Sequence, residues 1–154
     1  MQLVIGADHR GWESAQRLAE RLRMNGHDVQ LHGPEAGTTC DYPEPAWVIG
    51  RAVAGGACER GVLLCGTGIG TSIAANKIAG VRAAVVHDEL TAELSRSHND
   101  ANVLCMSADL LGQRLIEKIV DLWIKTEFDG GRHARRIEKI SAIEQNTDPK
   151  DVTP

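Results

Sequence analysis

The chain has 154 residues, of which 42% are hydrophobic and 25% are charged, and its formal net charge is −4. Its length suits one domain whose core needs no disulfide or metal, and its composition is typical of a globular protein. The negative charge argues against a nucleic-acid-binding protein, and no apolar run approaches the roughly 20 residues that cross a bilayer, so we do not expect a membrane protein.

The start of the chain and its cysteines bear on its compartment. Residues 1–6 resemble a strand and lack the basic start and the cleavage site of a secretory signal, so we expect a cytoplasmic location. The four cysteines form no Cys-x-x-Cys pair, which argues against a zinc knuckle or a thioredoxin-type site. We therefore expect reduced thiols.

Short apolar runs alternate along the chain with segments of helical period. In chain order, the pattern predicts a strand at 3–6, a helix at 12–24, a strand at 29–32, a helix at 46–54, a strand at 61–65, a helix at 72–78, a strand at 81–86, a helix at 89–97, a strand at 102–106 and a helix at 110–125. This alternation predicts parallel strands joined by right-handed crossovers, and hence an α/β fold. We expect a Rossmann-like three-layer sandwich around a five-stranded parallel sheet.

A further helix is predicted at 132–143, outside the repeating pattern. Its residues Ile137, Ile140 and Ile143 share one side, which suits an extra C-terminal helix used for dimerisation; packing on its own domain is the alternative. We expect residues 1–145 to form a single domain and the polar residues 146–154 to form a flexible tail.

Ligands of open parallel sheets collect at the carboxyl ends of the strands. Two loops follow predicted strands there: one contains Asp8 and His9, and the other runs from Cys65 to Gly70. The second loop lacks the Lys-Ser/Thr of a Walker motif, and its third glycine is misplaced for a dinucleotide fingerprint. Its backbone N–H groups and the following helix favour an oxyanion and the thiolate form of Cys65. A buried structural thiol is the alternative, and the other three cysteines keep that interpretation.

The remaining polar groups lie later in the chain. His98 and Asn99 precede the predicted strand 102–106, at the amino edge of the sheet, so we expect a second subunit to supply them. Arg132 and Arg136 are four residues apart on one helical face, where two guanidinium groups converge on one phosphate; a solvated basic face is the alternative. The sequence leaves open which subunit supplies these arginines.

Five motifs of the chain are informative together. They are Gly6-Ala7-Asp8-His9, Asp41-Tyr42-Pro43, the Cys65–Gly70 loop with residues 72–77, residues 94–100 with His98-Asn99-Asp100, and Gly130-Gly131-Arg132-His133. In this order and spacing the chain resembles ribose-5-phosphate isomerase type B, from about residue 3 to residue 145. The family also includes galactose-6-phosphate isomerase subunits, and it implies a homodimer or tetramer with its active site at the subunit interface. It further implies a cytoplasmic enzyme of carbohydrate metabolism, in the pentose phosphate pathway, without a metal or cofactor.

The resemblance implies that Cys65 moves a proton between C2 and C1, that His98 opens the furanose ring and that Thr67 assists it. Binding roles are implied for residues that hold the sugar hydroxyls (Asp8, Tyr42), the enediolate (Gly66, Gly68, Ile69, Gly70, Asn99) and the phosphate (His9, Arg132, Arg136). These roles agree with enediolate chemistry, which requires a base and preorganised donors.

Two positions depart from the family pattern. Asp109 stands where a phosphate-binding arginine is common, which weakens anion binding if nothing compensates. Phosphate recognition would then rest on His9, Arg132 and Arg136, with help from Arg10 or Arg114. Trp12 replaces a usual phenylalanine. The leading hypothesis is interconversion of D-ribose 5-phosphate and D-ribulose 5-phosphate. The alternatives are an isomerase of galactose 6-phosphate, allose 6-phosphate, a tetrose phosphate or a free sugar, a non-catalytic sugar-phosphate-binding module, and redox sensing at the cysteine.

Overall fold

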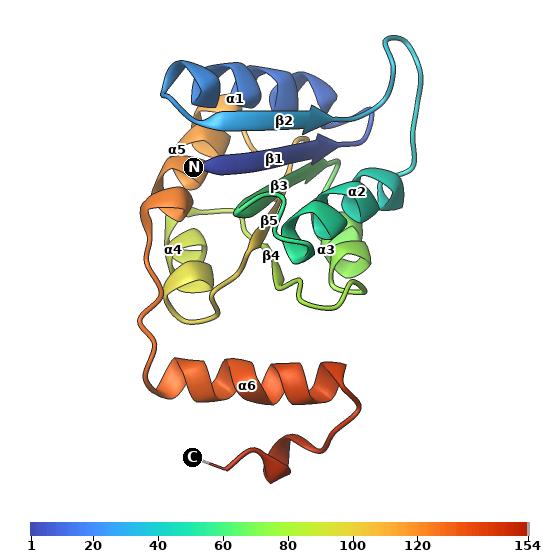
Figure 1. Ribbon diagram of the computed structural model, residues 1–154. Helices are drawn as coiled ribbons and strands as arrows, with labels where there is room; N and C mark the ends of the chain where they lie inside the picture. Colours follow the sequence, from blue (N-terminus) through green and yellow to red (C-terminus); the bar gives the residue numbers. More distant parts are fainter. Residues whose placement is uncertain (154) are drawn as a thin grey trace.

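The structure is a computed structural model that describes residues 1–153. Within these residues five parallel strands form one sheet in the order β2-β1-β3-β5-β4 (Figure 1). The strands are β1 (Gln2–Ala7), β2 (Asp28–His32), β3 (Arg60–Cys65), β4 (Ala83–Val85) and β5 (Val103–Ser107). The predicted α/β fold and parallel sheet are confirmed.

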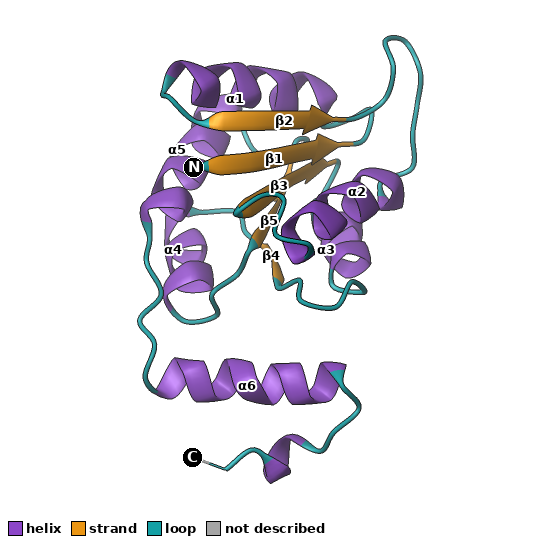
Figure 2. Cartoon of the chain, viewed as in Figure 1, coloured by secondary structure: helices purple, strands orange, loops and turns teal. Residues whose placement is uncertain are grey.

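Helices cover both faces of this sheet (Figure 2). The helices are α1 (Trp12–Met24), α2 (Pro43–Ala54), α3 (Ile69–Ala75), α4 (Glu89–Ser97) and α5 (Gln113–Lys125). One hydrophobic cluster joins α1, α4 and α5 to the sheet, and a second cluster joins α2 and α3 to its other face. Because both faces are covered, all six residues of β3 are buried, as expected of a central parallel strand.

Some boundaries differ from the predicted ones, for local reasons. Helix α2 begins at Pro43, since proline is well tolerated in the first turn of a helix. Helix α3 begins at Ile69 instead of residue 72, because Gly68 turns the chain with a φ of +79°. Helix α5 begins at Gln113 instead of residue 110, because the Ser107 hydroxyl accepts the Leu110 N–H and holds that segment as a turn.

Helix α6 (Arg132–Glu144) lies outside the three layers, below the sheet in Figure 1. The Glu144 carboxylate accepts a hydrogen bond from the Gly80 N–H at 2.9 Å, and a cavity of about 440 Å³ lies between α6 and the segment around β4. After α6 a short 3-10 helix, η1 (Pro149–Asp151), is held where Lys139 Nζ donates to the Pro149 carbonyl at 2.5 Å. The flexibility expected of this tail stays a prediction. No helix among residues 1–153 is long and apolar enough to span a membrane.

Candidate active site

Cys65 is the last residue of β3, and its side chain is buried at the carboxyl end of the sheet. The Gly68 N–H donates a hydrogen bond to Cys65 Sγ at 3.1 Å, and Thr71 Oγ1 lies 3.6 Å from the same sulfur. A backbone donor aimed at the sulfur can stabilise negative charge that develops there, because charge-assisted hydrogen bonds are stronger than neutral ones. The geometry therefore suits a base or nucleophile.

Thr71 is a site residue that the sequence analysis missed. Its hydroxyl donates to the Gly68 carbonyl at 2.9 Å, so it fixes the loop that presents the Gly68 N–H to the sulfur. The same hydroxyl is buried beside Cys65. A signal was available in the sequence, since Thr71 lies in the first turn of the helix that follows the cysteine loop.

The glycines in the loop after Cys65 allow its backbone to lie close to neighbouring residues. A Cβ atom at Gly68 would lie 3.0 Å from the Met106 carbonyl carbon, and the residue has a positive φ of +79°, so a glycine is required there. The hydroxyl oxygen of the exposed Thr67 accepts a hydrogen bond from the Ile69 N–H at 3.3 Å. It thereby provides a partner for an N–H group in the first turn of α3.

Tyr42 lies directly over this loop. Ring atoms Cε2 and Cζ of Tyr42 would be 2.6 and 2.7 Å from a Cβ atom at Gly70, so the phenol ring packs on the bare backbone of the glycine. Tyr42 is the residue before α2 and stays 44% exposed, which leaves its ring beside solvent. The start of α2 is therefore in contact with the Cys65–Gly70 loop.

Asp8 and His9 reach the same edge of the sheet from β1. The pairing of Ala7 with Leu64 in the register of β1 and β3 places Asp8 beside Cys65. The buried Asp8 accepts the N–H groups of Arg10 and Gly11 on Oδ1, at 2.9 and 3.0 Å, so its carboxylate organises its own loop. His9 Nδ1 lies 3.2 Å from the Cys40 carbonyl oxygen, which orients the imidazole.

Asp109 does not stand as an uncompensated charge. Arg10 Nε and Nη2 donate to Asp109 Oδ2 at 2.9 and 2.6 Å, and this pair borders Gly66, whose Cβ position would be 3.0 Å from that oxygen. The hydrogen bond and the charge of Asp109 raise the pKa of Arg10. Of the two arginines expected to help bind the phosphate, Arg10 is thus engaged by Asp109.

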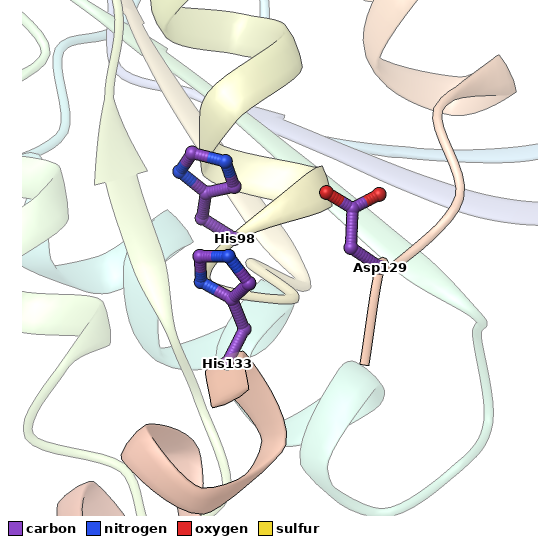
Figure 3. Close-up of side chains that lie close together, drawn as sticks. All are labelled: His98, Asp129 and His133. Carbon is purple, nitrogen blue, oxygen red and sulfur yellow. The ribbon is translucent and has the colours of Figure 1, made fainter. Parts of the chain in front are cut away.

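A second group of side chains lies at the opposite edge of the sheet. His98 follows α4, before β5 begins, and its ring stacks on that of His133 with centroids 4.2 Å apart and planes 10° from parallel. Figure 3 shows these two imidazoles with the carboxylate of Asp129 beside them. Exposed Arg132 and Arg136 extend from the same first turns of α6.

The loop that carries His98 and Asn99 is fixed by two arginines. Arg82 donates to the carbonyls of Asn99 and Asp100, and its Nη2 lies 2.8 Å from the Asp100 carboxylate. Arg96 Nη1 lies 2.8 Å from the other oxygen of that carboxylate. Asn99 is exposed and borders the cavity next to α6.

Within one chain, the predicted site residues therefore form two groups. The group around Cys65 gathers residues from β1, α2 and the glycine loop, namely Asp8, His9, Tyr42, Thr67, Gly66, Gly68, Ile69 and Gly70. The group around His98 gathers Asn99, Arg132 and Arg136. The parallel strands β3 and β5 separate them, because the first group follows the carboxyl ends and the second precedes the amino end of β5. The expected position of His98 at the amino edge is confirmed, and the roles of these residues stay predictions.

His98, Asp129 and His133 form a group of metal-ligating residue types among the described residues, with ligand atoms within 4.8 Å of one another. The arrangement does not suit one ion, however. The lone pairs of two parallel imidazoles run side by side instead of converging, and Arg132 Nε already donates to His133 Nε2 at 3.3 Å. A guanidinium at that distance also repels a cation.

Comparisons with known proteins agree with the geometry. Residues 3–140 match the family described as Ribose/Galactose Isomerase. The chain is 43% identical to ribose-5-phosphate isomerase B of Escherichia coli, over 94% of this chain and 97% of that protein. It is similar to the structure of Clostridium thermocellum ribose-5-phosphate isomerase B (TM-score 0.93, 44% identity, 95% and 99% of the two chains). It is also similar to Mycoplasma genitalium ribose-5-phosphate isomerase B with bound ribulose-5-phosphate (TM-score 0.88, 40% identity, 94% and 97%).

Proposed function

Because the chain belongs to the ribose/galactose isomerase family, we propose that it is an aldose–ketose isomerase that interconverts D-ribose 5-phosphate and D-ribulose 5-phosphate. Two matched proteins are ribose-5-phosphate isomerases B, one of them with ribulose-5-phosphate bound. The observation that carries the proposal is the N–H of Gly68 on Cys65 Sγ, which equips a buried sulfur to act as a base beside Asp8.

In the proposed reaction the Cys65 thiolate removes the proton from C2 of the open-chain aldose. The electron pair of that C–H bond forms the C1–C2 double bond of the enediolate, and negative charge moves to O1. This charge is stabilised by the Asn99 amide and by those N–H groups of residues 66–70 that do not already donate to Cys65 Sγ or Thr67 Oγ1, as donors that are already oriented do in enzyme sites. A proton then passes from the O2 hydroxyl to O1, and the electron pair left on O2 forms the C2=O2 carbonyl. The electrons of the C1–C2 double bond take the proton of the thiol at C1, which gives the ketose without a net change of protons.

The remaining proposed roles concern the sugar. Asp8 and Tyr42 hold its hydroxyl groups, and His9 binds the phosphate together with Arg132 and Arg136. His98 opens the furanose ring with the help of Thr67, whose hydroxyl proton stays available because its oxygen accepts the Ile69 N–H. No step calls for a metal or a cofactor.

We place the complete site between two subunits. His98, Asn99, Arg132 and Arg136 would reach the Cys65 group of a partner copy, since they lie at the other edge of the sheet in their own chain. Exposure of Ile140 (46%) and Ile143 (60%) on α6 supports a role for this helix in a homodimer, or in a tetramer built from such dimers. We place the enzyme in the cytoplasm, in pentose phosphate metabolism.

Mixing two inactive variants tests the shared site. Cys65→Ala and His98→Ala subunits are denatured together and refolded, and the isomerisation of D-ribose 5-phosphate is measured. A site built from two chains leaves each mixed dimer one intact site, so about a quarter of the wild-type activity returns. Failure of the mixture to recover activity, with mixed dimers present in native mass spectra, would contradict the shared site.

A substrate panel tests the reaction itself. Wild-type enzyme is assayed with D-ribose 5-phosphate, allose 6-phosphate, galactose 6-phosphate, erythrose 4-phosphate and free ribose, in D2O, so that C–H exchange is also detected. We expect the largest kcat/KM with D-ribose 5-phosphate. Binding of sugar phosphates without exchange or isomerisation would show a binding module instead of an enzyme.

A further inference from the structure

We propose that His133 is a positioning residue, which acts through His98 by holding its imidazole in the orientation needed for ring opening. This inference rests on the proposed function, because it assigns a support to the histidine that opens the ring. His133 itself lies behind His98 and has no role in the steps described above.

The imidazole rings of His98 and His133 stack closely, with nearly parallel planes. Their centroids are 4.2 Å apart and their planes are 10° from parallel, and Figure 3 shows His133 directly against the ring of His98. His133 is buried, whereas His98 is half-buried. The buried His133 ring covers one face of the His98 ring and therefore limits rotation of His98 about its side-chain torsions.

The backbone is built to place His133 there. The Asp129 N–H donates to the Ser97 carbonyl at 3.0 Å, which ties the segment before α6 to the residue that precedes His98. Gly130 and Gly131 then turn the chain with φ values of +63° and +55°, which other residues rarely adopt. Two successive turns of this kind bring the start of α6 back onto the end of α4.

The charge state of His133 suits this role. Arg132 Nε donates to His133 Nε2 at 3.3 Å, so that nitrogen carries a lone pair and the imidazole is neutral. Burial is the main cause that lowers the pKa of His133, followed by His98, Arg132 and Arg136, whereas Asp129 raises it. A neutral ring does not repel the positive charge that His98 gains when it accepts a proton.

The supported step is the opening of the ribofuranose ring. His98 takes the proton of the O1 hydroxyl, the O–H electron pair forms the C1=O1 carbonyl, and the C1–O4 bond breaks with its electrons on O4. The proton is then delivered to O4, so the histidine returns to its starting state. A rotated His98 loses this step but leaves the C2 proton transfer at Cys65 intact.

Ribulose 5-phosphate offers a clean comparison, because its phosphorylated O5 prevents it from closing a furanose ring. Two reactions are measured for each variant: turnover of ring-closed D-ribose 5-phosphate, and exchange of the C1 hydrogen of ribulose 5-phosphate with D2O. For His133→Ala we expect about a ten-fold lower kcat in the first reaction and about two-fold or less change in the second, since only the orientation of His98 is lost. His133→Phe retains a flat ring for stacking and should recover most of the lost rate.

The matched control is His27→Ala, which removes another histidine, located between α1 and β2, and should leave both reactions unchanged. Equal losses of both reactions in His133→Ala, or a rise of KM for both sugars, would show that His133 merely holds α6 and Arg132 in place, and would overturn the proposal. A rate with His133→Phe as low as with His133→Ala would overturn it too.

A second readout does not depend on activity. The ring protons of His98 lie over the His133 ring, so their NMR resonances should move downfield in His133→Ala when the ring current is lost, with unchanged melting temperature. A wild-type enzyme that isomerises no sugar but shows this shift would refute the proposed function and leave the contact standing. An active enzyme whose His98 resonances stay unmoved in the variant would refute the positioning role alone.

Discussion

Arg10 donates two hydrogen bonds to Oδ2 of Asp109, across 99 residues of sequence, at the border of Gly66. The pair is neutral as a whole, so the acidic residue adds no net repulsion toward a sugar phosphate in the cysteine loop. Asp109 is also tied to the loop through its own N–H, which donates to the Gly66 carbonyl at 3.3 Å. The pair thus couples the loops after β1, β3 and β5.

Breaking this pair should weaken substrate binding. In Arg10→Ala the carboxylate of Asp109 is left unpaired beside Gly66, so we expect KM for D-ribose 5-phosphate to rise about three- to five-fold, in line with the modest strength of exposed ion pairs. The double variant Arg10→Ala/Asp109→Ala should return KM toward the wild-type value. Steady-state kinetics of the wild type and the two variants at low salt measures this. A KM of the double variant above that of Arg10→Ala would contradict neutralisation as the function of the pair.

Removal of the thiol should stop proton transfer and leave binding intact. Cys65→Ala and Cys65→Ser are expected to lower kcat about 10³-fold with little change in substrate affinity, as for the loss of a general base. Cys105 cannot take over, because burial raises its pKa to about 12 and keeps it a thiol. Exchange of the C2 hydrogen of the aldose, followed by NMR in D2O, is the measurement. The control is Cys58→Ala, in the core outside the site; exchange at the wild-type rate in Cys65→Ala would refute the mechanism.

A methyl group at Gly70 should displace Tyr42. The Cβ atom of Gly70→Ala would lie 2.6 to 3.0 Å from three atoms of the Tyr42 ring, which has room to move because it is partly exposed. We expect KM to rise about ten-fold or more while the melting temperature changes little, since a site residue is misplaced but the core is untouched. Gly112→Ala serves as the control because a Cβ atom there meets open space. Equal KM values in the two variants would show that Tyr42 does not contact the substrate.

The ion pair between α1 and α5 should make stability depend on acid pH. Arg21 Nη1 donates to Asp121 Oδ1 at 2.8 Å, and hydrogen bonding to Arg21 is the main cause that lowers the pKa of Asp121. A carboxylate with a lowered pKa contributes stability above its unfolded pKa, near 3.9, and loses it as the pH falls through the folded pKa. We expect the free energy of unfolding to fall below about pH 4 less steeply in Asp121→Asn than in the wild type. Urea unfolding between pH 2 and 7 measures this, and parallel pH profiles would contradict the assignment.

Chelators should leave the reaction unaffected. The parallel imidazoles of His98 and His133 do not converge on one ion, and the proposed proton transfer uses a thiolate and backbone N–H groups. After dialysis against EDTA, we expect kcat to stay within about two-fold of its starting value, because the proposed proton transfer requires no Lewis acid to stabilise the enediolate. Metal analysis accompanies the assay. Activity that is lost with the chelator and restored by zinc or cobalt would contradict this mechanism.

The sequence by itself determined the order and kind of the elements. Apolar period separates strands from helices locally, which is why helices α1 and α4 have the predicted bounds 12–24 and 89–97. It also placed Cys65 at a strand end, and strand ends meet at one edge of a parallel sheet whatever the strand order. The group around Cys65 followed from that rule. The start of α3 was predicted three residues late, because the positive φ of Gly68 shortens the loop in a way that apolar period does not register.

Only the tertiary structure decided which distant side chains meet. The partnership of Arg10 with Asp109 depends on the loops after β1 and β5 approaching the same glycine, and composition does not encode that approach. The stacking of His133 on His98 depends on the Gly130-Gly131 turn, which returns α6 to the end of α4. Hydrophobic patterning is a property of neighbours along one element, whereas such polar contacts depend on the relative placement of elements, which packing of the whole sheet fixes. That is why the cysteine loop could be found in the sequence, and the support behind His98 could not.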